Sequence, residues 1–134
     1  MPMPSLETLE FRGALGTFRP RGKYSLVEAV DLISNAIARC RERKVGMLLV
    51  DATGFIDLPV PTLVDRFLMV EDWANESGGT VVVAMVAPTA FIHPRKFGVK
   101  AAHQFGLICD VYSSEDEASA WLSATSSSAT RNSE

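Results

Sequence analysis

The sequence predicts a single α/β domain with a mixed, mostly parallel β-sheet of about five strands, about four helices and an N-terminal β-hairpin. Two apolar runs rich in branched residues, Met47–Val50 and Thr80–Val86, are typical of strands covered on both faces. Helical patterns flank each run, and this alternation is typical of βαβ units. The chain has 134 residues, 47% of them hydrophobic, which suits one domain with one core.

The first elements are predicted from turn and capping signals. Residues 6–19 alternate loosely between apolar and polar on either side of a turn at Arg12-Gly13-Ala14, which predicts a hairpin. Ser25 and Glu28 form a capping-box pattern, so we expect a helix to begin there. Its inward stripe has 4-3-4-3 spacing and consists of Leu26, Val30, Ile33, Ile37 and Cys40.

A proline-rich elbow that begins at Phe55 leads into the second predicted helix. The expected core-facing stripe of this helix consists of Val60, Leu63, Val64, Phe67, Val70 and Ala74. Met69 and Trp73 form an i,i+4 apolar pair on the flank of that stripe. Surplus apolar surface can mark a partner site, and an edge tucked under a neighbouring loop is the alternative.

The third helix is expected to open at His93-Pro94, since proline tolerates the first helical position, and to end at Gly106. Its inward edge is expected to contain Phe97, Ala101 and Phe105. Leu107–Tyr112 is the last predicted strand.

A second capping-box pattern, from Ser114 to Glu117, predicts a fourth helix that buries Ala118, Trp121 and Leu122. Residues 123–134 are polar and have no apolar period, which predicts a disordered tail. We therefore expect the domain to span residues 1–122.

Charge and hydropathy argue against nucleic-acid and membrane classes. The formal net charge is −3. Residues 1–44 carry eight Lys/Arg and five Asp/Glu, a net charge of +3, and residues 45–134 carry five Lys/Arg and eleven Asp/Glu, a net charge of −6. The pI near 5.4 is well below that of nucleic-acid-binding domains. The sequence has no apolar run of about 18–20 residues and no signal-peptide pattern at its start, so we expect a cytoplasmic protein without a membrane span.

Sharp catalytic and metal-binding motifs are missing from the sequence. It contains no Gly-rich phosphate loop, no Gly-x-Ser-x-Gly and no Cys-x-x-Cys, which disfavours an enzyme. His93, His103 and Cys109 lack the paired spacings of zinc sites, so no metal or other cofactor is expected. Cys40 and Cys109 fall at apolar positions typical of buried thiols.

Ligands of open parallel sheets gather at the carboxyl ends of the strands, beside helix amino ends. This rule selects a set of candidate residues: Asp51, Thr53, Asp57, Thr62, Thr89, His93, Arg95 and Lys96.

Each candidate also has a structural interpretation. Asp51 could act as a general base or metal ligand, or accept N–H bonds from its own loop. Thr62 could be a reactive or modified hydroxyl, or cap its helix with Asp65 three residues on. His93 could shuttle protons, or serve as an N-cap.

Arg95 and Lys96 are predicted in a first helical turn, where cations oppose the helix dipole. That placement favours an anion or an acidic partner at this spot.

The order of elements and residues 46–67 resemble the STAS superfamily, the fold of bacterial anti-sigma-factor antagonists, and most closely its small STAS/SEC14-like bacterial proteins. The resemblance covers about residues 6–122 and includes the strand ending in Val50-Asp51, the Phe55-Ile56-Asp57 elbow and the Pro94–Gly98 helix start. It implies a regulatory domain that acts by docking and, in some relatives, a pocket for a small or lipid ligand. The family's phosphorylated serine is not matched, because Leu58, Pro59 and Val60 occupy that motif.

The leading hypothesis is a non-catalytic STAS-like interaction domain. It would present the elbow and Thr62, with Arg66, Met69 and Trp73 alongside, to a protein partner or to a second copy in a homodimer.

Two alternatives remain open. One is a ligand-binding module whose pocket lies near Phe55, Phe91 and Phe97, with Arg95 or His93 meeting an anionic group. The other is an enzyme that uses Asp51 and His93 as acid and base, which requires both residues within reach of one substrate.

Overall fold

The computed structural model describes Leu6 and residues 8–132, with side chains described up to residue 125. The described elements, in chain order, are β1 Leu9–Arg12, β2 Leu15–Phe18, β3 Gly22–Lys23, α1 Leu26–Glu42, β4 Met47–Asp51, the 3₁₀ helix η1 Ala52–Gly54, β5 Phe55–Ile56, α2 Leu63–Ser77, β6 Val82–Val86, the 3₁₀ helix η2 Thr89–Phe91, α3 Phe97–Gln104, β7 Cys109–Tyr112 and α4 Glu115–Asn132.

The main sheet has five strands in the order β1-β2-β4-β6-β7. β1 and β2 are antiparallel, and the pairs β2–β4, β4–β6 and β6–β7 are parallel. This mixed, mostly parallel sheet with its N-terminal hairpin confirms the predicted fold class. The capping box at Ser25 is also confirmed, because the Ser25 hydroxyl accepts from the Glu28 N–H and the Glu28 carboxylate accepts from the Ser25 N–H.

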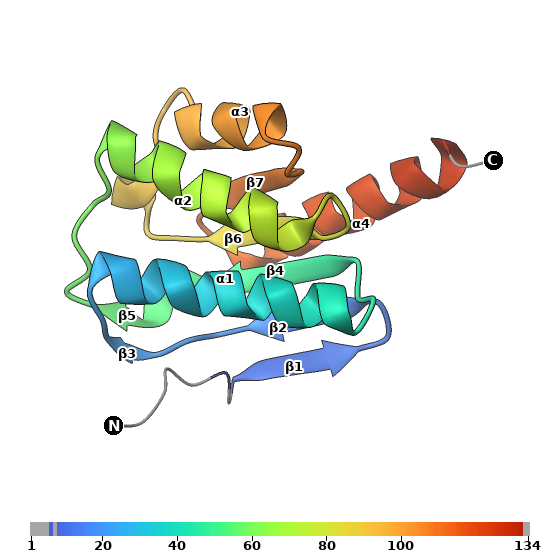
Figure 1. Ribbon diagram of the computed structural model, residues 1–134, viewed down its shortest axis with the longest axis horizontal. Helices are drawn as coiled ribbons and strands as arrows, with labels where there is room; N and C mark the ends of the chain where they lie inside the picture. The colour runs from blue at the N-terminus through green and yellow to red at the C-terminus, as the bar shows by residue number, and fades with distance from the viewer. Residues whose placement is uncertain (1–5, 7, 133–134) are drawn as a thin grey trace.

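Helices cover both faces of the sheet (Figure 1). On one face α1, α2 and α3 pack over a large core that includes Leu48 and Val50 of β4. On the other face α4 packs over a smaller core that includes Leu49 of β4. Alternate residues of β4 therefore point into different cores, as expected of a central strand with helices on both sides.

A two-stranded parallel sheet, β3 with β5, lies beside the main sheet and has no counterpart in the sequence-based prediction. Gly54 precedes β5 and approaches the preceding chain closely, since a Cβ there would lie 2.6 Å from the Pro20 carbonyl oxygen. The absence of a side chain at this position lets the elbow fold back against the segment before α1.

The predicted orientation of α2 is wrong for its first half. Val60, Leu63, Val64 and Phe67 were expected in the core, and they are 42–66% exposed. Val70 and Ala74 are buried as predicted.

The stripe that faces the core instead contains Met69 and Trp73, the pair expected on the flank. Trp73 is 4% exposed, and its indole N–H donates to the Val30 carbonyl oxygen of α1 at 3.2 Å. An indole carries the largest apolar surface of the helix, so turning it inward removes more apolar area from water than burying the valines would.

The third helix begins at Phe97, three residues later than predicted. His93 is not its N-cap: Lys96 precedes the helix with φ +49°, in the left-handed region, which ends the preceding turn and separates it from α3. Phe105, predicted to face inward, is 44% exposed, and Ala101 is buried as predicted.

The fourth helix buries Ala118 and Leu122 as predicted, whereas Trp121 is only partly buried. Ser114 caps it, since its hydroxyl accepts from the Glu117 N–H at 3.2 Å and donates to the Glu117 carboxylate at 3.1 Å. The helix continues to Asn132, where the sequence predicted a disordered tail from residue 123. Adding residues to an existing helix is far easier than nucleating one, so the helix continues through a segment rich in serine and threonine, which are weak helix formers. Residues 133–134 of the predicted tail lie outside the described residues.

Candidate functional site

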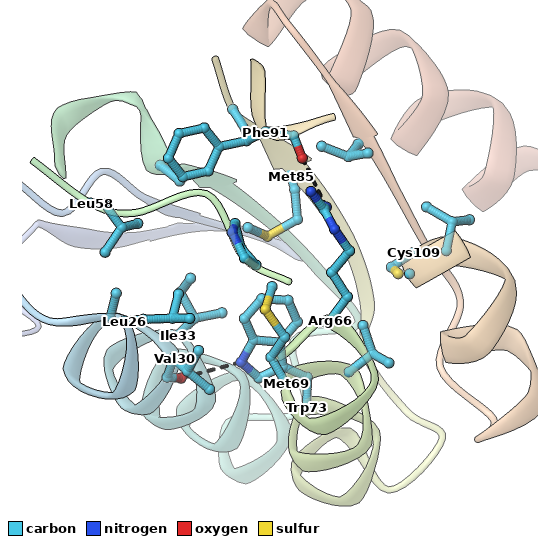
Figure 2. Close-up of a pocket in the computed structure, with 18 of the residues that line it drawn as sticks. Leu26, Val30, Ile33, Leu58, Arg66, Met69, Trp73, Met85, Phe91 and Cys109 are labelled. Atoms are coloured by element: carbon cyan, nitrogen blue, oxygen red, sulfur yellow. Dashed lines mark hydrogen bonds between the residues drawn. The ribbon is translucent and has the colours of Figure 1, made fainter. Parts of the chain in front are cut away.

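A pocket of about 110 Å³ lies between the sheet and the helices α1, α2 and α3, at the carboxyl ends of β4, β6 and β7. Figure 2 shows the side chains that surround it. A second hollow of about 190 Å³ shares four lining residues with the pocket. Those four residues are Ala52, Phe55, Leu58 and Phe91.

Three layers of side chains build the pocket. Its floor is the sheet, which contributes Met85 and Cys109. Its walls come from the helices, including Val30 of α1 and Met69 of α2. The elbow contributes Leu58 and Pro61, and the loop after β6 contributes Phe91. Nearly all of these groups are apolar, so the pocket favours an apolar occupant.

The residues at the end of β4 hold their own loop in place. The Asp51 carboxylate accepts from the Thr53 backbone N–H at 3.0 Å and from the Thr53 hydroxyl at 2.6 Å. This arrangement matches the structural interpretation of Asp51. Further along the elbow, Asp57 is exposed, has φ +56° and lines the second hollow.

Thr62 is the N-cap of α2. Its hydroxyl accepts from the Asp65 N–H at 3.1 Å, and the Asp65 carboxylate accepts from the Thr62 N–H at 2.9 Å. The capping interpretation of Thr62 is therefore confirmed, and this reciprocal pair fixes the angle at which α2 leaves the elbow.

Arg66 is the cationic residue that lines the pocket, and it is partly buried. In Figure 2 its side chain extends from α2 toward the loop after β6, where Nη1 donates to the Phe91 carbonyl oxygen at 2.9 Å. This bond ties two walls of the pocket together.

The predicted anion site at Arg95 and Lys96 has a different geometry. Neither residue lies in the first turn of α3, because the helix begins at Phe97. His93 Nδ1 accepts from the Arg95 N–H at 3.0 Å, and the His93 ring packs on Phe97 with centroids 4.6 Å apart. His93 therefore serves a local turn instead of capping the helix.

Lys96 is paired within the protein. Its ammonium group donates to the Asp110 carboxylate at 2.7 Å and to the Val111 carbonyl oxygen at 3.1 Å, and it lies 4.7 Å from the centre of the Tyr112 ring. Burial opposes ionisation of Asp110, but hydrogen bonds from Lys96, the Val111 N–H and Tyr112 outweigh it and lower the Asp110 pKa. Burial and the Asp110 carboxylate raise the pKa of Tyr112 to about 12.

A separate ion pair joins the end of β2 to the start of α4. Arg19 donates two hydrogen bonds of 2.9 Å to the Glu115 carboxylate. This bidentate pair lowers the pKa of Glu115 to about 2.

The structure thus brings an apolar pocket and Arg66 together, whereas Thr62 and Lys96 are engaged in local hydrogen bonds. Met69 and Trp73, predicted to face a partner, line the pocket wall instead. Phe55 and Phe91 line the pocket as the ligand-binding alternative expected, but Phe97 is not part of the lining. Arg66 takes the place proposed for Arg95 or His93.

Arg66, expected beside a protein partner, lines the pocket instead, and the sequence of α2 contains a signal for this placement. The inward positions of α2 follow helical spacing: Arg66, Met69, Val70, Trp73, Ala74 and Ser77. A cation on a stripe that is apolar apart from Ser77 is unusual for a core helix and is the residue to examine first.

The two cysteines are free and buried, as predicted. Burial raises the pKa of Cys40 to about 11 and, together with the neighbouring Asp110 charge, that of Cys109 to about 12. Within the described part of the chain, no group of three or more His, Cys, Asp or Glu side chains is arranged to hold a metal ion. None of the described helices combines the length and apolar character needed to cross a membrane.

Comparison of the chain with family models, with curated proteins and with solved structures finds no match. The resemblance to STAS domains therefore stays a prediction.

Proposed function

We propose that the protein is a non-catalytic, STAS-like binding module that holds a small, mostly apolar ligand in the pocket between the sheet and α1, α2 and α3. The observation that carries the proposal is the lining itself: side chains from three helices, the elbow and the sheet converge on one space, and nearly all are apolar. Natural ligand pockets share this composition, with a small number of polar anchors.

The volume of the pocket limits the ligand to a compact group. A dry cavity of about 150 Å³ accommodates benzene. At about 110 Å³, with the neighbouring hollow as an extension, the pocket suits one ring or a short branched chain.

Filling the pocket tests this function. Val99 of α3 lines the pocket, so Val99→Phe should occupy space that the ligand needs. With fluorobenzene as the probe, ¹⁹F NMR should show binding to the wild-type protein, and Val99→Phe should weaken binding about tenfold or more.

The matched control is Val27→Phe on α1, which makes the same change at a side chain that is 70% exposed and is not part of the pocket lining. This variant should bind fluorobenzene like the wild-type protein. The proposal fails if the wild-type protein leaves the fluorobenzene signal unchanged, or if both variants bind the probe equally well.

A second candidate function, docking to another protein molecule, is favoured by the exposed part of α2. The α2 apolar patch consists of Leu63, Val64, Phe67 and Leu68 of α2 together with Val60 of the elbow, each of them more than 40% exposed. Contiguous exposed apolar surface of this kind marks interaction sites, and a two-fold contact between copies is the simplest form. The patch adjoins the elbow and Thr62, which the docking hypothesis expected at the partner surface. The exposed apolar residues of the patch take the role that the hypothesis gave to Met69 and Trp73.

A charge placed in the patch tests self-association. Val64→Glu should convert a dimer to a monomer in sedimentation velocity while the protein stays folded, because Val64 is 66% exposed. Val27→Glu, an equally exposed position on α1, should leave the mass unchanged. A wild-type protein that sediments as a monomer at all concentrations would rule out the homodimer.

A further inference from the structure

Arg66 indicates which chemical group the ligand carries, and this inference rests on the ligand binding proposed above. The residue occupies an inward position of α2, one turn before Met69 and Val70, and its side chain lines the pocket. Figure 2 shows the guanidinium group on the side of the pocket formed by Phe91 and Met85. A cation therefore borders a space whose other walls are mostly apolar.

Most of the hydrogen-bonding capacity of Arg66 is unused within the part of the chain that the structure describes. A guanidinium has five N–H donors. Among the described residues, one of them is engaged, by the Phe91 carbonyl oxygen, and no carboxylate lies within 4.0 Å of the Arg66 side-chain nitrogens. The other donors are not among the buried side-chain atoms that lack a partner, so they are open to solvent, and a ligand acceptor can bind them without breaking a hydrogen bond within the protein.

Asp110, the acid that lines the pocket, does not compete with a ligand for Arg66. Asp110 lines the same pocket, but Lys96 and the Val111 N–H bind its Oδ1, and the Tyr112 hydroxyl donates to its Oδ2 at 3.0 Å. Lys96 neutralises the charge of Asp110, so among the described residues that line the pocket Arg66 is the cation available to an anion.

We propose that the ligand is a small amphiphile with one carboxylate, whose ring or short chain lies against Trp73 and Met85 while its carboxylate binds Arg66. The planar guanidinium fork matches a carboxylate with two parallel hydrogen bonds. A single guanidinium balances one negative charge, which favours a carboxylate over a doubly charged phosphate in a mostly apolar pocket.

The test compares two probes of nearly the same shape, 4-fluorobenzoate and the neutral 4-fluorobenzamide, by ¹⁹F NMR titration at neutral pH. The wild-type protein should bind the carboxylate about tenfold or more tightly than the amide. Arg66→Met, which keeps the length of the side chain and removes its charge, should abolish this preference while amide binding changes by less than about twofold.

Arg66→Lys provides the matched control for charge. A lysine keeps the positive charge but lacks the bidentate fork, so this variant should retain part of the preference for the carboxylate. Thermal melts report folding separately from binding. If they show that Arg66→Met does not fold, Arg66→Lys is the variant that tests the assignment.

The outcomes separate this inference from the proposed function. If the wild-type protein binds both probes equally, or if Arg66→Met retains the preference, the carboxylate assignment is wrong and the apolar pocket stands. If neither probe nor fluorobenzene binds, both the assignment and the ligand-binding function are wrong. A loss of stability in Arg66→Met with an unchanged preference would show that Arg66 only ties α2 to Phe91.

Discussion

At the scale of single residues, the polar side chains of this protein divide into those that serve local structure and those that face the pocket. Asp51 and Thr62 each bind backbone N–H groups within three residues of their own position. Their spacing in the sequence predicted this, because capping and loop bonds are local. Arg66 differs, since its partner Phe91 lies 25 residues away and only the fold brings them together.

The Arg19–Glu115 pair gives a residue-scale prediction about pH. The folded-state pKa of Glu115 is about 2, below the value of an unfolded glutamate near 4.3, so the stabilisation is present above the unfolded pKa and is lost as pH falls through the folded pKa. The pair is exposed, with 46% of the Arg19 and 32% of the Glu115 side chain accessible. Solvent screening limits the effect to about 1 kcal/mol at most.

Urea unfolding of Glu115→Gln checks this prediction. The variant should be less stable than the wild-type protein at neutral pH, and the difference should disappear between about pH 4 and pH 2. Asp116→Asn, the neighbouring exposed acid in the same first turn of α4, controls for the general effect of charge on the helix dipole. A difference that stays constant with pH would contradict the assigned pKa.

At the scale of elements, α2 shows how two apolar stripes compete on one helix. Both the stripe through Leu63 and Phe67 and the stripe through Met69 and Trp73 fit helical spacing. The sequence pattern alone cannot rank them. The neighbouring helix α1 does, because its Val30 carbonyl oxygen accepts the Trp73 indole N–H and its buried side chains belong to the same core as Trp73.

The orientation of α2 gives an element-scale prediction. Trp73→Ala should lower the free energy of unfolding by about 3–5 kcal/mol, since it removes a buried aromatic side chain and leaves a cavity. Leu68→Ala on the same helix should change it by less than about 0.5 kcal/mol, because Leu68 is 58% exposed. Chemical denaturation measures both values, and similar losses in the two variants would show that α2 does not face the core through Trp73.

At the scale of the whole molecule, one sheet divides the protein into two cores of different size. The larger core lies under α1, α2 and α3 and contains both buried thiols, Cys40 and Cys109. The pocket belongs to this side, so the same packing that stabilises the fold also forms the candidate binding site.

The buried thiols give a prediction for the whole molecule. Both have raised pKa values, so under native conditions at pH 8 they remain protonated and covered. Ellman's reagent has two aromatic rings and is too large for the pocket of about 110 Å³ that Cys109 lines, so reaction with either thiol requires opening of the core. It should label them about 1,000-fold or more slowly than in guanidinium chloride. Ser119→Cys on the exposed surface of α4 should add one rapidly labelled thiol. Rapid labelling of the unmodified protein would mean that the larger core opens readily.

The sequence by itself determined the features that depend on neighbours along the chain. These include the hairpin, the capping boxes at Ser25 and Thr62, the apolar strands and hence the α/β fold. Tertiary structure alone decided which stripe of α2 is buried, that Lys96 pairs with Asp110, and that Arg66 borders an apolar pocket. The physical reason is that burial and ion pairing between distant segments depend on how helices pack against one sheet, and the periodicity of a single segment does not contain that information.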